Sequence, residues 1–237
     1  MISSRLAAGL AGRNIHYGWV VAATTFLTML ATAGAVGAPG VMIVPLQREF
    51  GWQNADISSA LAVRLVLFGL MGPFAAAFMN RFGIRPVVAS ALALIMAGII
   101  GSLLMTEVWQ LMLLWGLVVG LGTGMTALVL GATVATRWFA QRRGLVVGML
   151  TASTATGQLV FLPLLAELTE RFGWRLALTL VLGVLLVAML LVLVLMRDRP
   201  SDVGLAPYGS KELAPPPATE HGLGTLLLSP LVALREA

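Results

Sequence analysis

The chain has 237 residues, of which 59% are hydrophobic and only 11% are charged. Soluble domains carry about a quarter charged residues, so this composition excludes an ordinary soluble domain and indicates a protein of the lipid bilayer. The net charge of +5 comes from arginines at segment ends with few aromatic neighbours, which argues against nucleic-acid binding, and the lack of cysteine excludes disulfide and thiolate chemistry.

Six apolar runs follow one another along the chain. A helix needs about twenty residues to cross a hydrocarbon core about 30 Å thick, and its backbone groups must pair within the span. We therefore expect an all-α membrane protein with six transmembrane helices, a bundle over residues 17–197. The predicted spans are Tyr17–Leu46, Ile57–Met79, Pro86–Met105, Val108–Trp138, Gly144–Leu168 and Trp174–Met196.

The first run contains the segment TAGAVGAPG at 32–40, in which three glycines precede or follow Pro39 closely. Proline has no backbone N–H and tends to kink a helix. Two consequences stay open: freed backbone groups that face a substrate, or a kink without ligand contact. Thr32 is a candidate for binding a solute. A cleaved signal peptide is the lesser alternative, because the apolar run continues to Pro45.

Arg64 stands near the middle of the second run, eight residues after Asp56. Eight residues correspond to about 12 Å along a helix, and arginine at the centre of a span costs about 2.5 to 3.5 kcal/mol. Such a charge normally faces an interior cavity and a partner. We consider three interpretations: Arg64 binds an anionic substrate, it pairs with an acid or carbonyl of a second half, or its side chain extends toward Asp56.

The fourth run places small residues on one face, and the fifth run does the same. Gly116, Gly120 and Gly124 recur every four residues, as do Gly144 and Gly148. Small residues let helices approach closely in lipid, so we predict that these positions pack helices together. The segment GLGTG at 120–124 follows no strand, so a dinucleotide site is rejected.

Hydroxyl and amide groups provide further candidates for binding a solute. Thr151, Thr154 and Gln158 share one face of the fifth run at spacings of three and four residues, and Thr126 is a weaker candidate in the fourth run. These groups either line a pathway or form hydrogen bonds between helices. The apolar cores of the spans hold no Cys, His, Asp or Glu, so we expect no metal, no cofactor and no enzyme activity.

The chain changes character after the sixth run. Residues 198–222 are polar and include three consecutive prolines, which predicts an extended, solvated linker. Residues 223–237 are apolar but too short to span, so we interpret them as the start of a truncated seventh helix. Residues 1–16 form the expected N-terminal tail.

The distribution of basic residues predicts the orientation. A cytoplasmic N-terminus places Arg5, Arg13, Arg81, Arg85, Arg137, Arg142, Arg143, Arg197, Arg199 and Lys211 on the cytoplasmic side. The opposite side then holds only Arg48, Arg171 and Arg175. This asymmetry follows the positive-inside rule and predicts a multi-pass protein of the cell (inner) membrane.

A hinge sequence occurs twice. Residues 80–85 read NRFGIR and residues 170–175 read ERFGWR, ninety positions later. The same shift overlays runs one to three on runs four to six. Because three is odd, the second triplet starts on the other side of the membrane, which predicts two inverted three-helix repeats of the kind found in secondary transporters. The alternative is that each copy is only a helix stop with a left-handed glycine cap.

The segment GPFAAAFMNRFGIRP resembles the loop motif of the major facilitator superfamily. The matching residues are Gly72, Arg81, Gly83 and Arg85, whereas Asn80 stands where the family has Asp. That departure questions the charge relay usually assigned to the loop. The segment RWFAQRRGLVVGMLTASTATG is similar to the signature of monocarboxylate-porter-like members, with Arg142 and Arg143 as its basic pair. YGWVV at 17–21 and RDRPSDVGLAPYG at 197–209 resemble segments of bacterial oxalate/formate-antiporter-like members.

The resemblance implies the N-terminal half of a twelve-helix secondary transporter. Its substrate would be a small organic anion such as a mono- or dicarboxylate, moved by alternating access through symport or antiport. Its partners would be the lipid bilayer and a missing C-terminal half or a second copy. In animal monocarboxylate porters a Lys follows the proline that corresponds to Pro39; Gly40 stands here, so proton coupling of that type is not supported. The alternative function is a non-transporting half-size scaffold or receptor, or a homodimerising half-transporter.

Overall fold

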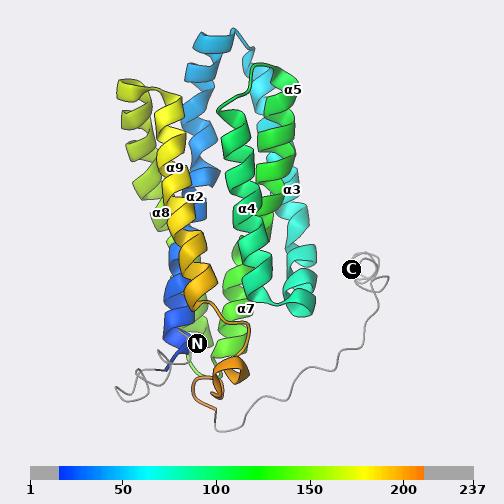
Figure 1. Cartoon of the computed structure of the whole chain (residues 1–237), viewed down its shortest axis with the longest axis vertical. Helices are drawn as coiled ribbons and strands as arrows, with labels where there is room; N and C mark the ends of the chain where they lie inside the picture. Colours follow the sequence, from blue (N-terminus) through cyan, green and yellow to red (C-terminus); the bar gives the residue numbers. More distant parts are fainter. Residues whose placement is uncertain (1–15, 211–237) are drawn as a thin grey trace.

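The computed structural model describes residues 16–210, and these form an elongated bundle of helices (Figure 1). Six helical segments are long and apolar enough to cross a membrane. Their elements are α2 (Gly18–Phe50), α3 (Asn54–Phe82), α4 (Ile84–Ser102), the series α5 (Val108–Leu111), η1 (Met112–Val119), α6 (Gly120–Met125) and α7 (Leu128–Trp138), then α8 (Arg143–Phe172) and α9 (Trp174–Leu195). All six predicted spans and the all-α class are confirmed.

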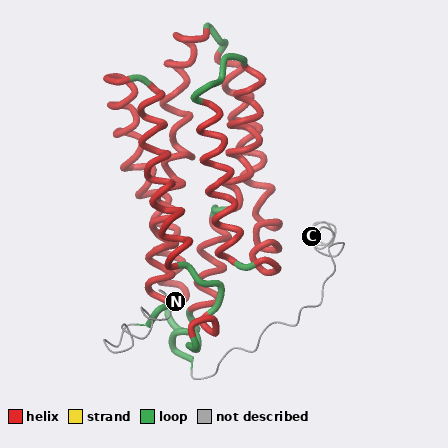
Figure 2. Tube along the Cα trace, in the orientation of Figure 1, coloured by secondary structure: helices red, strands yellow, loops and turns green. Residues whose placement is uncertain are grey.

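The fourth span is less regular than a single helix. It begins as the short helix α5, continues as the π-helix η1, and returns to α-helical geometry in α6. The helix is then interrupted at Thr126–Ala127 before α7, and Figure 2 shows this interruption within the bundle, whereas the other loops lie at its two ends. The first span is continuous, because α2 is one helix of 33 residues that contains both Pro39 and Pro45.

The two repeats exchange their first helices. Helix α2 packs mainly on α8 and α9, whereas η1 and α6 pack on α3 and α4. Each first helix therefore stands among the second and third helices of the other repeat. This arrangement places α2 and the fourth span at the centre of the packing, next to the mid-span position of Arg64.

The repeated hinge adopts the same backbone conformation in both copies. Gly83 has φ 95° and ψ 162°, and Gly173 has φ 86° and ψ 159°. These angles are not those of the left-handed cap that we considered, and they lie in a region that essentially only glycine occupies. The two hinges differ in their surroundings, because a Cβ atom on Gly83 would lie 2.6 Å from Cγ of Asp198, whereas one on Gly173 would meet nothing within 4 Å.

Alanine at each hinge should separate backbone strain from contact. Both Gly83→Ala and Gly173→Ala are expected to lower the free energy of unfolding by about 1 to 3 kcal/mol, because alanine strains this conformation. Gly83→Ala should cost more, since Asp198 must also move. Thermal unfolding of the purified bundle in detergent measures the difference. Equal losses would contradict the Asp198 contact.

Seven arginines define one end of the bundle, which we call the basic end: Arg81, Arg85, Arg137, Arg142, Arg143, Arg197 and Arg199. It is the lower end in Figure 1, where α2 begins and α9 ends. The first part of the predicted linker packs back onto this end. The amide of Tyr208 donates to the carbonyl oxygen of Trp138 at 2.8 Å, and the carbonyl oxygen of Tyr208 accepts from the amide of Ala140 at 2.9 Å.

Aromatic contacts hold the same segment. The ring of Tyr208 lies against those of His16, Trp19 and Phe139, with centroids 5.6 to 5.9 Å apart. Residues 198–210 are therefore packed rather than extended. The tail with Arg5 and Arg13, the remainder of the linker with Lys211, and the predicted seventh helix lie outside the described residues.

Candidate functional site

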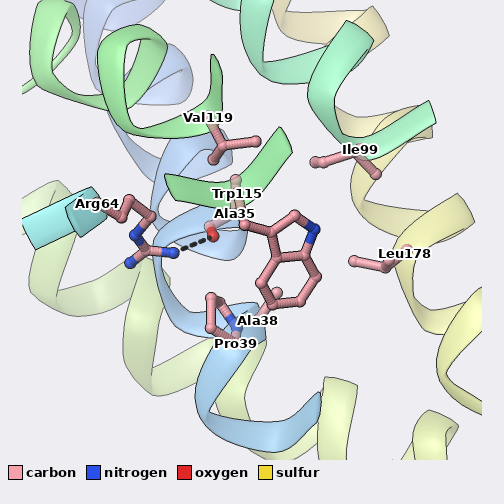
Figure 3. Close-up of a pocket in the computed structure, with 8 residues that line it drawn as sticks. All are labelled: Ala35, Ala38, Pro39, Arg64, Ile99, Trp115, Val119 and Leu178. Atoms are coloured by element: carbon pink, nitrogen blue, oxygen red, sulfur yellow. Dashed lines mark hydrogen bonds between the residues drawn. The ribbon is translucent and has the colours of Figure 1, made fainter. Parts of the chain in front are cut away.

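The guanidinium of Arg64 lies inside the bundle and points at α2. Arg64 is 6% exposed. Its Nη2 donates to the carbonyl oxygen of Val36 at 2.7 Å. Its Nη1 donates to that of Ala35 at 3.3 Å, which is the bond drawn in Figure 3. The side chain therefore does not extend toward Asp56, and its partners within the described chain are neutral carbonyls of the first helix.

Pro39 explains why one of these carbonyls is available. In an α-helix the carbonyl of residue i accepts the amide of residue i+4, and the residue four positions after Ala35 is Pro39. Proline has no amide proton, and its ring crowds that same carbonyl. Arg64 supplies the missing donor. The freed backbone group expected in the first span therefore contacts a charged side chain of the same half.

Glycines of the fourth span hold the stem of Arg64. A Cβ atom on Gly120 would lie 3.3 Å from both Cα and Cγ of Arg64, and one on Gly116 would lie 3.3 Å from the carbonyl oxygen of Ala60. On Gly124 it would lie 2.7 Å from Cβ of Met71. The three glycines thus lie where α3 and the fourth span approach most closely. No larger residue fits there without moving α3.

A small cavity lies beside Arg64. It is lined by Ala35, Ala38, Pro39, Arg64, Ile99, Trp115, Val119 and Leu178 (Figure 3). The space open to the centre of a water molecule is ≈ 10 Å³, which is about enough for one water. Trp115 belongs to η1 and is 3% exposed, and its indole N–H has no partner among the described residues. The site is closed around Arg64 in this conformation.

The predicted hydroxyl candidates divide into two groups. Thr32 and Thr126 are buried, and their hydroxyls donate to carbonyls of their own helices, at 3.0 Å to Met29 and at 3.3 Å to Gly122. Both lie in the packed interior. On α8, Thr151 is exposed, and Thr154 and Gln158 are half-buried.

Helix α8 reaches α2 one turn away from Arg64. A Cβ atom on Gly157 would lie 2.6 Å from Cβ of Ala33 and 2.8 Å from the carbonyl oxygen of Leu30. Arg64 contacts Ala35 and Val36. Gly157 separates Thr154 from Gln158 on the same helix. Gly157 and Arg64 thus approach neighbouring turns of α2.

Gly144 and Gly148 do not pack helices within the described bundle. A Cβ atom on either would meet nothing within 4 Å. The close approach of α8 to α2 occurs instead at Gly157, on another face of α8. The spacing of four residues in the sequence does not reveal which face of α8 is covered by α2. Thr151 is exposed as well.

The loop motif at the basic end forms a polar network. The side-chain oxygen of Asn80 accepts from Nη2 of Arg137 at 2.8 Å, and the same nitrogen donates to the carbonyl oxygen of Met79 at 2.8 Å. The backbone amide of Arg85 donates to Asp198 at 2.7 Å. Asn80 therefore retains a hydrogen bond to an arginine, while the carboxylate near Gly83 comes from Asp198.

The remaining motif residues have structural contacts. A Cβ atom on Gly72 would lie at an ordinary distance of 3.7 Å from Cγ2 of Val129 in α7, and Arg81 lies over the ring of Phe82. Arg142 has a positive φ of 60° where α8 begins, and Nε of Arg143 donates to the carbonyl oxygen of Phe139 at 2.5 Å. Arg137 and Asp198 were not identified from the sequence as motif partners. The only available signal was that each charge stands directly beside the end of an apolar run.

The other end of the bundle carries a charged cluster and a wide groove. Glu49 accepts from the indole N–H of Trp174 at 2.6 Å and from Nη1 of Arg175 at 2.5 Å. The groove has a volume of ≈ 570 Å³ and lies between the ends of α2 and α8, with Arg48 and Glu170 among its lining residues.

Comparison with known proteins identifies a family profile and several proteins to which the chain is similar. The Major Facilitator Superfamily profile matches residues 22–234. The chain is 33% identical over 193 residues to monocarboxylate transporter 11 of Homo sapiens, covering 78% of this chain and 40% of that protein. It is 30% identical over 159 residues to monocarboxylate transporter 9 of Mus musculus, covering 66% and 31%. An MFS-type transporter of Gibberella zeae is 28% identical over 158 residues, covering 66% and 36%.

The chain thus spans less than half the length of each of these relatives. Its six membrane-capable helices are the number expected for half of a twelve-helix carrier. The loop motif, the signature before α8 and the profile match agree on one assignment, which is a family of transporters rather than enzymes. The chain belongs to the Major Facilitator Superfamily and is similar to its monocarboxylate transporters.

Proposed function

We propose that the chain is one half of a secondary transporter that moves a small organic anion, such as a mono- or dicarboxylate, by alternating access. The observation that carries the proposal is Arg64, a buried guanidinium bound only to neutral carbonyls among the described residues. A guanidinium presents parallel N–H groups that suit a carboxylate. The names of the monocarboxylate transporters similar to this chain support the same substrate class.

Burial without a carboxylate partner distinguishes Arg64 from the other charged side chains. The ion pairs of the described chain, Glu49 with Arg175 and Glu167 with Arg171, lie at the end opposite the basic end and are half-exposed or exposed. A charge inside a span normally marks a substrate pathway or has a partner. Thr154 and Gln158 are proposed as secondary contacts, because they are half-buried and lie on either side of Gly157, which packs on a neighbouring turn of α2.

The second half is proposed to cover the open face of α3 and α8. Gly69 on α3 and Gly144 and Gly148 on α8 are surrounded by open space, and Leu65 and Leu159 are 63% and 77% exposed. Small residues allow close helix contact in lipid. The occupant is the missing C-terminal half or a second copy of the chain. Both would close a pathway along α2.

The orientation is proposed from the charges. Seven arginines gather at the basic end, while Arg48, Arg171 and Arg175 lie at the opposite end. The positive-inside rule then places the basic end, and with it the start of α2, in the cytoplasm. Coupling to a gradient, as symport or antiport, is proposed from the family alone.

Flux through reconstituted vesicles tests the function. Proteoliposomes containing the chain together with a second half should accumulate radiolabelled pyruvate or oxalate, and excess unlabelled anion inside should accelerate uptake if exchange occurs. Vesicles with the chain alone separate a homodimer from a half that needs a partner. Absence of flux in every arrangement would reject transport and favour a scaffold.

A further inference from the structure

We propose that Pro39 positions Arg64 for anion binding: the carbonyl that Pro39 frees holds the guanidinium while the site is empty, and a carboxylate takes its place on binding. Pro39 would thus act through Arg64 and would not touch the substrate. The inference rests on the proposed function. It assigns Pro39 the role of setting how strongly α2 holds the guanidinium of Arg64 while no substrate is bound.

The first step is the inequality of the two carbonyls. The carbonyl of Val36 has a helical donor, because the residue four positions later is Gly40, which carries an amide. The carbonyl of Ala35 has no such donor, because Pro39 follows at that spacing. An unpaired carbonyl inside lipid is costly. The hydrogen bond from Arg64 therefore satisfies the carbonyl of Ala35 in α2, and the same bond holds the guanidinium of Arg64 in place.

The second step is the strength of this contact. A carboxylate partner would bind the guanidinium with charge-assisted, bidentate hydrogen bonds. The two carbonyls are neutral, and the bond to Ala35 is long at 3.3 Å. The contact therefore satisfies the charge in the empty site, yet an incoming carboxylate binds the same nitrogens more strongly. A buried acid at this position would instead compete with the substrate.

The third step is that only the tip of the side chain can move. A Cβ atom on Gly120 would lie 3.3 Å from both Cα and Cγ of Arg64, so the backbone of the fourth span packs closely against the stem. The small cavity beside the guanidinium also borders Ala35 and Pro39. One water fits there. That water would donate to the carbonyl of Ala35 when Arg64 turns to the anion.

Restoring the amide tests the proposal. In Pro39→Ala the new N–H at position 39 pairs with the carbonyl of Ala35 and weakens the already long bond of that carbonyl to Arg64. Pyruvate then displaces a weaker contact, and its KM in the reconstituted transporting assembly should fall by up to about tenfold. The maximal rate should not rise, because the change acts on anion binding. A merely structural role of Pro39 would instead change the maximal rate or the amount of folded protein.

The same helix offers a matched control. Pro45 also lies within α2, and the carbonyl that it frees is that of Val41, which is not an acceptor for Arg64. Pro45→Ala should leave KM within about twofold of the unsubstituted assembly. Equal shifts of KM in Pro39→Ala and Pro45→Ala would overturn the proposal. So would an unchanged KM in both.

A second measurement does not depend on an alanine variant that folds. Pro39→Gly restores the same amide. In the unsubstituted assembly, saturating pyruvate should also speed amide hydrogen exchange around residues 36–40, because the anion draws Arg64 away from α2. Slower or unchanged exchange there, with pyruvate shown to bind by protection elsewhere, would overturn the inference alone. Failure of both pyruvate and oxalate to bind or move would instead reject the proposed function.

Discussion

Replacing Arg64 by glutamine should reduce uptake of small carboxylates about hundredfold. Each hydrogen bond to a charged group contributes about 1.5 to 3 kcal/mol, and a bidentate contact loses both. Glutamine still offers an amide donor to the carbonyls of Ala35 and Val36, and it removes a charge whose burial is costly in a membrane. The bundle should therefore fold as before. Initial rates of pyruvate and oxalate uptake into proteoliposomes measure the loss.

Two variants make this result specific. Arg64→Lys keeps the charge but loses the planar fork, so uptake should be intermediate. Arg171→Gln removes the same charge from an exposed surface pair with Glu167 and should change uptake less than about twofold. If Arg171→Gln lowers uptake as much as Arg64→Gln, a general charge effect explains the loss. If Arg64→Gln transports normally, Arg64 does not bind the substrate.

Leucine at Gly148 should abolish uptake without destabilising the bundle. Gly148 lies on the open face of α8, where an added Cβ atom meets nothing within 4 Å. The variant bundle alone should therefore unfold at the same temperature as the unsubstituted one. In the proposed transporter this face contacts the second half, and leucine would separate two closely packed helices. Uptake and co-purification of the two halves measure the effect.

Gly183 provides a matched control on α9. It is also exposed, and an added Cβ atom meets nothing within 4 Å. Helix α9 lies outside the proposed face of α3 and α8, so Gly183→Leu should face lipid and retain uptake. Equal loss in both variants would argue against a specific contact at α8. A lower unfolding temperature of Gly148→Leu alone would mean that position 148 packs within this half.

The sequence determined the number, length and order of the spans. Hydrophobic runs bounded by charges are a local property, and lipid requires each run to satisfy its own backbone as a helix. The repeat was visible for the same reason, since the hinge sequence around Gly83 recurs around Gly173. The structure gives the two glycines nearly the same backbone angles. Arg64 was identified because a charged residue within an apolar run can be recognised from the sequence without knowledge of its contacts.

Only the tertiary structure decided which partner each of these residues meets. The spacing of prolines and glycines along a helix is known from the sequence, but the rotation of one helix against another is not. That rotation brings Arg64 to the carbonyl that Pro39 leaves free, and it covers Gly157 while Gly148 stays open. It also brings Asp198 beside Gly83, although 115 positions separate them. Contacts between helices depend on side chains from several distant segments at once, so no single segment specifies them.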